Sequence, residues 1–146
     1  MAQTGDRNDP YTAFNFLIEI DGFTLAGFSE CSGLTNETDP IEYRNGDEDI
    51  TVRKLPGLKK YTNIVLKRGY TDNTDIWDWR KTVEDGRTER RSGSIVLLNE
   101  AREPALRWNF RQGWPSKLEG PTLNGTGNET AIETFEICHE GLEMVV

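Results

Sequence analysis

The chain has a single histidine, His139, and this limits the catalytic chemistry open to it. One histidine cannot supply a metal site that needs several imidazole ligands, and it leaves one candidate base for a Ser-His-Asp nucleophile set. His139 could still act as a lone general base beside Glu136 or Glu140. Its place at the end of an expected strand, two residues before Gly141, instead favours a structural hydrogen-bonding role. We therefore expect no enzymatic reaction.

The other polar clusters also lack the spacing that chemistry requires. Asp47-Glu48-Asp49 has neither the ligand spacing nor the closing Glu of a calcium-binding loop. Gly125-Thr126-Gly127 lacks the Lys of a phosphate-binding loop. We interpret the remaining carboxylates near the C-terminus as a solvated row rather than an acid pair; they are Glu133, Glu136, Glu140 and Glu143.

Composition narrows the class of protein further. The two cysteines, Cys31 and Cys138, are too few for a disulfide framework, so we interpret them as small buried thiols and expect no metal and no cofactor. A net charge of -8 argues against a dedicated nucleic-acid-binding surface. No run approaches the ~20 apolar residues of a membrane span, and the first residues lack a signal peptide's apolar core. We expect a protein made in the cytoplasm that binds neither membranes stably nor nucleic acid specifically.

The apolar residues recur mostly with a period of two, which is typical of strands with one buried face. The clearest strand is Phe14–Ile20, which ends at the turn dipeptide Asp21-Gly22. Leu106–Arg111 alternates apolar and polar residues in the same way. Ser94–Leu98 is a short apolar run, and the turn over Asn99–Pro104 joins it to that strand as a hairpin. The chain is therefore predicted to be mainly β.

One segment alone has helical spacing, because Ile76, Trp79 and Val83 fall on one stripe. Gly86 can close this helix, which we predict over about residues 74–85. The apolar stripe of the helix needs a sheet to bury it. The predicted architecture is one domain over residues 1–146, a small antiparallel β-barrel or β-sandwich with one helix and a flexible N-terminus at residues 1–10.

Five stretches of the chain, taken together in their order along the sequence, carry a resemblance to a known family. Of these, Arg53–Tyr70 is a basic, turn-centred loop that feeds a strand. The series resembles the inner tail tube proteins of contractile phage tails and of related extracellular contractile injection systems. The resemblance runs nearly from end to end and rests on the ordered series rather than on any single motif. The stretches are Asp9–Gly22, Ala26–Leu34, Arg53–Tyr70, Trp108–Pro121 and Ala131–Glu143.

The resemblance implies a tail-tube-like fold and a structural function. The chain would form rings, expected to be hexameric, that stack into an inner tube with a central channel for cargo delivery. The implied partners are other copies of the chain, a sheath protein around the tube, baseplate or spike proteins, terminator proteins, and cargo in the lumen, either a protein effector or DNA. The assembly would be a phage tail or a phage-tail-like particle.

The resemblance also implies a long extended arm, over about residues 38–60, that reaches into the neighbouring ring. Its acidic and basic parts could pair head to tail between layers, since opposite charges at two ends of a subunit suit heterologous stacking. The candidate inter-ring contacts are Asp47, Glu48, Asp49, Arg53, Lys54, Leu55 and Pro56. Two strands, Phe14–Ile20 and Tyr61–Lys67, are the candidates for the subunit seams and the lumen. Their candidate residues are Asn15, Leu17, Glu19, Asn63, Val65 and Lys67.

One alternative from a different class stays open. A monomeric β-barrel could hold a small apolar or glycan ligand in its mouth, as a binding module. The two interpretations differ in oligomeric state, because a tube subunit joins other copies of itself and a binding module has no need to.

Overall fold

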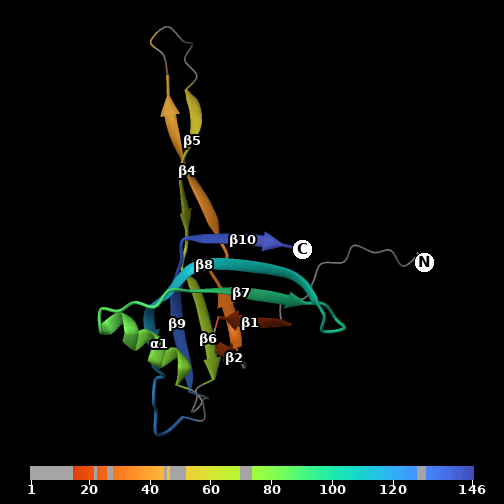
Figure 1. The fold of residues 1–146 in the computed structure, drawn as a ribbon, viewed down its shortest axis with the longest axis vertical. Helices are drawn as coiled ribbons and strands as arrows, with labels where there is room; N and C mark the ends of the chain where they lie inside the picture. The colour runs from red at the N-terminus through yellow and green to blue at the C-terminus, as the bar shows by residue number, and fades with distance from the viewer. Residues whose placement is uncertain are drawn as a thin grey trace, which may run out of the picture.

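The structure, a computed structural model, describes residues 15–21, 23–25, 28–44, 46, 52–69, 74–127 and 131–146, with the backbone alone for 23–25. The described strands and helix, in chain order, are β1 (Phe16–Ile20), β2 (Phe23–Leu25), β3 (Phe28–Ser32), β4 (Asn36–Tyr43), β5 (Arg53–Tyr61), β6 (Ile64–Gly69), α1 (Asp75–Glu84), β7 (Arg91–Leu98), β8 (Pro104–Glu119), β9 (Ile132–Cys138) and β10 (Gly141–Val145). Figure 1 shows a sheet-rich body with one helix at its side and a long hairpin projecting from it. The predicted mainly β, antiparallel fold with one helix is confirmed.

The 16-residue strand β8 joins two layers of sheet. Its first half pairs with β7 on one side and β10 on the other, and its second half pairs with β9. Gln112, between the halves, has a positive φ of 54°. The first layer is β2-β1-β7-β8-β10, and the second layer is β8-β9-β6-β3. Among the described strands the order runs from β2 to β3 without closing, so the body is an open, folded-over sheet rather than a closed barrel.

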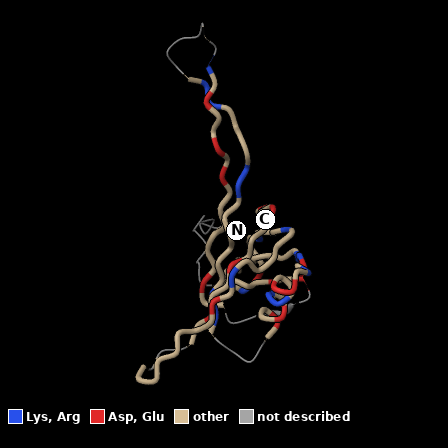
Figure 2. Tube along the Cα trace, turned by 90° about the vertical axis from the view of Figure 1, so that its left-hand side faces the viewer, with Lys and Arg blue, Asp and Glu red and all other residues tan. Residues whose placement is uncertain are grey.

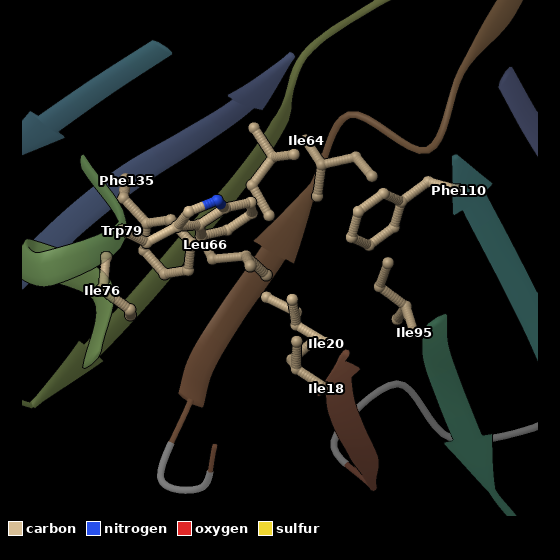
Figure 3. Packing of buried hydrophobic residues seen from close by; sticks show 10 residues of the cluster. Ile18, Ile20, Ile64, Leu66, Ile76, Trp79, Ile95, Phe110 and Phe135 are labelled. Carbon is tan, nitrogen blue, oxygen red and sulfur yellow. The ribbon is translucent and has the colours of Figure 1, made fainter. Parts of the chain in front are cut away.

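The core lies between these two layers. The first layer contributes Ile18, Ile20, Ile95 and Phe110, and the second contributes Ile64, Leu66, Phe135 and Ile137. Figure 3 labels these side chains except Ile137 and shows them meeting, with Ile76 and Trp79 of α1 packed beside Leu66 and Phe135. Burial of these large apolar side chains is the main stabilising term of the fold.

The helix α1 forms where its spacing predicts it, at Asp75–Glu84. Ile76 and Trp79 of the predicted stripe are buried, and the Trp79 indole donates to the main-chain oxygen of Glu89 at 2.7 Å. Gly86 follows the helix with a φ of 76°, the left-handed conformation that glycine adopts at a helix end. The hairpin predicted around Asn99–Pro104 is also present, as the pair β7 and β8.

The prediction of one strand over Tyr61–Lys67 is wrong, because this segment is divided between two strands. Tyr61 ends β5 and Ile64 begins β6, because Thr62 and Asn63 leave the strand. Gly33 has a φ of 89° and packs closely on Asn63. A Cβ at Gly33 would lie 2.0 Å from the main-chain oxygen of Asn63. The chain therefore turns from the hairpin into the body at this point.

Candidate functional site

The hairpin of β4 and β5, which we call the arm, is a two-stranded sheet that stands apart from the body (Figure 1). It extends from Asn36 to Tyr61, slightly beyond the predicted range of 38–60. Arg53, Lys54, Leu55 and Pro56 lie at the start of β5, on the part of the strand nearest the tip. The predicted contacts Asp47, Glu48 and Asp49 lie outside the described residues.

The arm has one apolar face. Ile41 pairs directly with Leu55, and Tyr43 pairs with Arg53, so these residues share a face. The exposed fractions of Ile41, Tyr43 and Leu55 are 53%, 44% and 46%. Among the described residues no core covers this apolar surface, and two-stranded hairpins are marginally stable on their own. The arm is thus a surface suited to burial against another molecule.

The arm also carries opposite charges on its two strands, as Figure 2 shows. The ammonium of Lys60 lies 2.7 Å from the Asp39 carboxylate, and this hydrogen-bonded partner raises the pKa of Lys60. Glu42 pairs across the strands with Lys54. The strand register therefore brings acidic and basic residues together within one arm. Charge pairing was expected only between layers, so this pairing within one arm was not predicted.

The outer face of the second layer is polar. Val65 and Lys67 alternate with buried residues of β6, so they lie on the side away from the core. Lys67 forms an ion pair with Glu30 at 3.3 Å, and Asn63 donates to the Ser116 hydroxyl at 3.5 Å. The registers place two rows of residues on this second-layer face; they are Glu30, Lys67, Thr134 and Glu119, then Ser32, Val65, Glu136 and Lys117.

The other predicted seam residues belong to the first layer. Leu17, 45% exposed, and Glu19 alternate with buried isoleucines of β1, and Glu19 accepts a hydrogen bond from Arg107 at 2.9 Å. Asn15 is buried, with 9% exposure, and its main-chain oxygen accepts a hydrogen bond from the Leu98 amide. The outer faces of the two layers lie on opposite sides of the core. The structure therefore does not bring the six predicted residues together.

Comparison with known proteins identifies the family. The model of the family of T4-like virus tail tube protein gp19 matches residues 12–143 of the sequence. The chain belongs to this tail tube family. It is a tube subunit of the contractile injection type, and no curated protein sequence gives a significant match.

Several solved structures have the same fold. A chain of the PVC sheath-tube complex, an extracellular contractile injection system in its extended state, is 28% identical, with a TM-score of 0.84 over 94% of this chain and 93% of that one. A chain of the tube terminating cap of the anti-feeding prophage (AFP) is 27% identical, with a TM-score of 0.85 over 99% of both chains. Hcp1 from Flavobacterium johnsoniae shares the fold more distantly, at 15% identity and a TM-score of 0.51 over 88% of this chain and 94% of that one.

In this tube protein, His139 fixes the root of the arm. Its ring nitrogens lie 3.1 Å from the main-chain oxygens of Thr62 and Gly141, and Tyr61 at the end of β5 packs on the ring at 5.6 Å. Burial lowers the pKa of His139, although the two carbonyls oppose that change. Because both nitrogens face main-chain carbonyls, the geometry suits a structural role, as the sequence indicates, better than that of a general base.

A buried ion pair lies beneath α1 and was not predicted. Arg68 of β6 donates to the Glu133 carboxylate of β9, and the side chains are 3% and 2% exposed. The Trp77 indole donates to the other Glu133 oxygen at 3.3 Å. The interpretation of Glu133 as solvated is wrong, because its alternation with Phe135 and Ile137 places it on the buried face. That alternation is the signal that could have found it.

The remaining chemical groups of interest are the metal-ligating side chains, the two thiols and the helix. Within the described ranges, no three His, Cys, Asp or Glu side chains gather closely enough to hold a metal ion. Cys31 and Cys138 are free thiols, and burial raises the pKa of Cys31 to about 12. The helix in the described part of the chain is not long and apolar enough to cross a membrane.

Proposed function

We propose that this tube protein assembles into six-membered rings that stack into the inner tube of an extracellular contractile injection system. The observation that supports this most is the likeness, over nearly the whole chain, to tube-associated chains of the PVC and AFP particles. The proposed partners are other copies of the chain, a surrounding sheath protein, baseplate or spike proteins and a terminator protein. The subunit is made in the cytoplasm, acts passively and catalyses no reaction.

The proposed cargo is a protein effector that passes through the lumen. The polar second-layer face is the surface that we assign to the lumen. On it, Glu30 pairs with Lys67, and Glu136 lies in register with Lys117, so opposite charges are interspersed. A face of this kind gives a large cargo neither an extended apolar patch nor a single-sign field to bind to. The first-layer face, with its exposed Leu17, is the less suitable wall.

The lumen assignment is tested by labelling single cysteines in assembled tubes. Lys67→Cys and Glu19→Cys place thiols on opposite outer faces, in a background with Cys31 and Cys138 replaced by serine. We expect a small maleimide to label both, and a bulky polymer-linked maleimide to label position 19 far faster than position 67. Faster bulky labelling at position 67 would reverse the assignment. Equal labelling of the disassembled variants is the control.

The arm is the proposed contact between successive rings. Its length supports this, because the nine residues of β5 at ~3.3 Å each extend about 30 Å from the body. A contact between different surfaces of identical subunits repeats without closing on a dimer, and so builds a stack. Arg53 and Lys54, with Leu55 and Pro56, lie at the end that would enter the next ring. The acidic residues at 47–49 are the proposed continuation of this contact.

Charge reversal tests the arm. The double variant Arg53→Glu and Lys54→Glu should prevent stacking while leaving the circular dichroism spectrum and the melting temperature of the monomer unchanged. A matched control, Lys81→Glu and Arg87→Glu, reverses two charges near α1 instead and should still form tubes. Normal tubes from the arm variant would show that these charges of the arm do not form the inter-ring contact.

A further inference from the structure

The loop between β8 and β9 carries an asparagine followed by a glycine, Asn124 and Gly125. Figure 1 shows this loop at the end of the body opposite the arm. Asn124, Gly125 and Thr126 are all exposed, and none of them belongs to the core, the arm or the second-layer face. Solvent therefore reaches both the side chain of Asn124 and the peptide that follows it.

The side chain of Asn124 is folded into a tight turn. The Gly127 amide donates to the main-chain oxygen of Asn124 at 3.3 Å, which closes the turn over residues 124–127. The Thr126 amide donates to Asn124 Oδ1 at 3.1 Å, as in an Asx turn. The ring closed by this second bond contains the Gly125 nitrogen. The amide carbon of Asn124 and the nitrogen of Gly125 are therefore held within one short ring.

Two donors are directed at the same side-chain oxygen. Besides the Thr126 amide, the Thr126 hydroxyl donates to Asn124 Oδ1 at 2.9 Å. Attack on an amide carbon moves negative charge onto its oxygen, and donors at about 2.7–3.1 Å stabilise that charge as it develops. Thr126 thus supplies both donors of a small oxyanion hole around the Asn124 side chain.

The nucleophile available in this turn is the main-chain nitrogen of Gly125. Glycine has no side chain beside that nitrogen, and its backbone is free to adopt the conformation that ring closure requires. A Cβ built at Gly125 would meet nothing within 4 Å, so the surrounding space is open as well. The turn therefore brings together an unhindered nitrogen, an amide carbon and an oxyanion hole.

We propose that Asn124 is a site of spontaneous deamidation, in which the Gly125 nitrogen attacks Asn124 Cγ while Thr126 stabilises the oxygen. The attacking nitrogen forms the N–Cγ bond and gives its proton to solvent. The Cγ–Nδ2 bond breaks, and the side-chain nitrogen takes up a proton and leaves as ammonia. Water then opens the resulting succinimide at either carbonyl, which gives aspartate or isoaspartate at position 124. Solvent water is the co-reactant, and no electrons are transferred to or from the chain.

The modification changes the charge and the backbone of this end of the body. Each converted chain gains one negative charge beyond its net charge of -8. Isoaspartate also inserts the side-chain methylene into the main chain, so the turn over residues 124–127 loses its hydrogen-bonding register. The reaction depends on this turn and not on assembly into a tube.

Peptide mapping by mass spectrometry tests the proposal on the purified full-length chain, incubated at mildly alkaline pH. The wild-type chain should accumulate aspartate and isoaspartate at position 124. Thr126→Val keeps the amide donor and removes the hydroxyl, so conversion should slow by about two- to tenfold, the value of one hydrogen bond. Gly125→Ala fits the open turn and should slow conversion as well, because it adds a side chain beside the attacking nitrogen.

Two matched controls separate the effect of the turn from that of exposure. Thr122→Val removes a hydroxyl from the same loop outside the turn and should leave the rate at Asn124 unchanged. Asn99 also accepts a main-chain hydrogen bond at its Oδ1, from Glu103 at 3.0 Å, but it precedes Glu100 rather than a glycine. It should therefore convert far more slowly than Asn124 in the same sample.

The rates in urea decide whether the folded turn is responsible. Unfolding separates the Thr126 hydroxyl from the Asn124 side chain, so the wild-type chain and Thr126→Val should then convert at the same rate. Equal rates in the two native proteins, or no conversion at position 124, would overturn the proposal. A difference that persists in urea would assign the effect to the local sequence and would equally contradict the role of the turn.

Discussion

The buried pair of Arg68 and Glu133 makes the strongest prediction about stability. In Glu133→Gln the shape is kept and the amide oxygen can still accept from the Trp77 indole, but Arg68 loses its carboxylate partner in a site that is nearly inaccessible to water. Removing one member of a buried pair costs about 3–5 kcal/mol, because the other charge stays buried. At about 2–4 °C per kcal/mol for a chain of this size, the melting temperature should fall by roughly 6–20 °C.

The assay is urea unfolding and thermal unfolding of the monomer, each followed by fluorescence and circular dichroism at a protein concentration below that of assembly. Glu19→Gln is the matched control, since Glu19 pairs with Arg107 at the surface, where the side chains are 55% and 36% exposed. An exposed pair of this kind contributes about 0–1 kcal/mol. If Glu133→Gln proved no more destabilising than Glu19→Gln, the argument from burial would be wrong.

Three further predictions follow from the core and the root of the arm. Burial lowers the pKa of His139, so below about pH 6.5 the unfolded chain binds a proton that the native chain resists; the free energy of unfolding should therefore fall as the pH decreases from 6.5, and His139→Gln should remove this dependence in a pH series of urea titrations. A Cβ at Gly113 would lie 2.5 Å from the Phe110 ring, so Gly113→Ala should cost about 1–3 kcal/mol, while Gly120→Ala, with open space around it, should be nearly neutral by the same unfolding measurement. Trp79→Phe removes the hydrogen bond to Glu89 and should cost about 1–3 kcal/mol, and an unchanged melting temperature would show that this bond adds nothing.

The spacing of apolar residues in the sequence predicted the individual strands and the helix that bury one face. The alternation around Ile18 and Ile20 indicated β1, and the stripe through Ile76 and Trp79 indicated α1 with its glycine end. In both cases one face is buried, so the spacing of the apolar residues in the sequence equals the period of the element. The arm was predicted as well, but from family resemblance rather than from periodicity.

What the sequence did not show depends on contacts between distant residues. The partners Arg68 and Glu133 are 65 positions apart, so the burial of Glu133 follows from strand pairing. The interruption at Asn63 depends on the close approach of Gly33 from another segment. The strand indicated over Leu106–Arg111 continues as β8 as far as Glu119, because β9 pairs along its second half.

The position of the arm was predicted from the sequence, but the facing of its residues was not, because facing depends on the strand register. Family resemblance placed the arm correctly, whereas the direct pairing of Ile41 with Leu55 became visible only with the strand register. The expected seam residues were chosen from two strands that turn out to belong to different layers, so Leu17 and Lys67 face away from each other across the core. A one-dimensional pattern gives the faces of each strand but not which faces of different strands coincide.

Electron microscopy of the purified wild-type chain at high concentration, with rotational classification of end views, tests the central claim most directly. The account predicts six-fold rings with an open centre that stack into tubes, or the extension of supplied tube ends where spontaneous nucleation is slow. A chain that stays at the mass of one 16.6 kDa subunit and adds to no tube end would contradict it, and would return the protein to the class of monomeric ligand-binding modules.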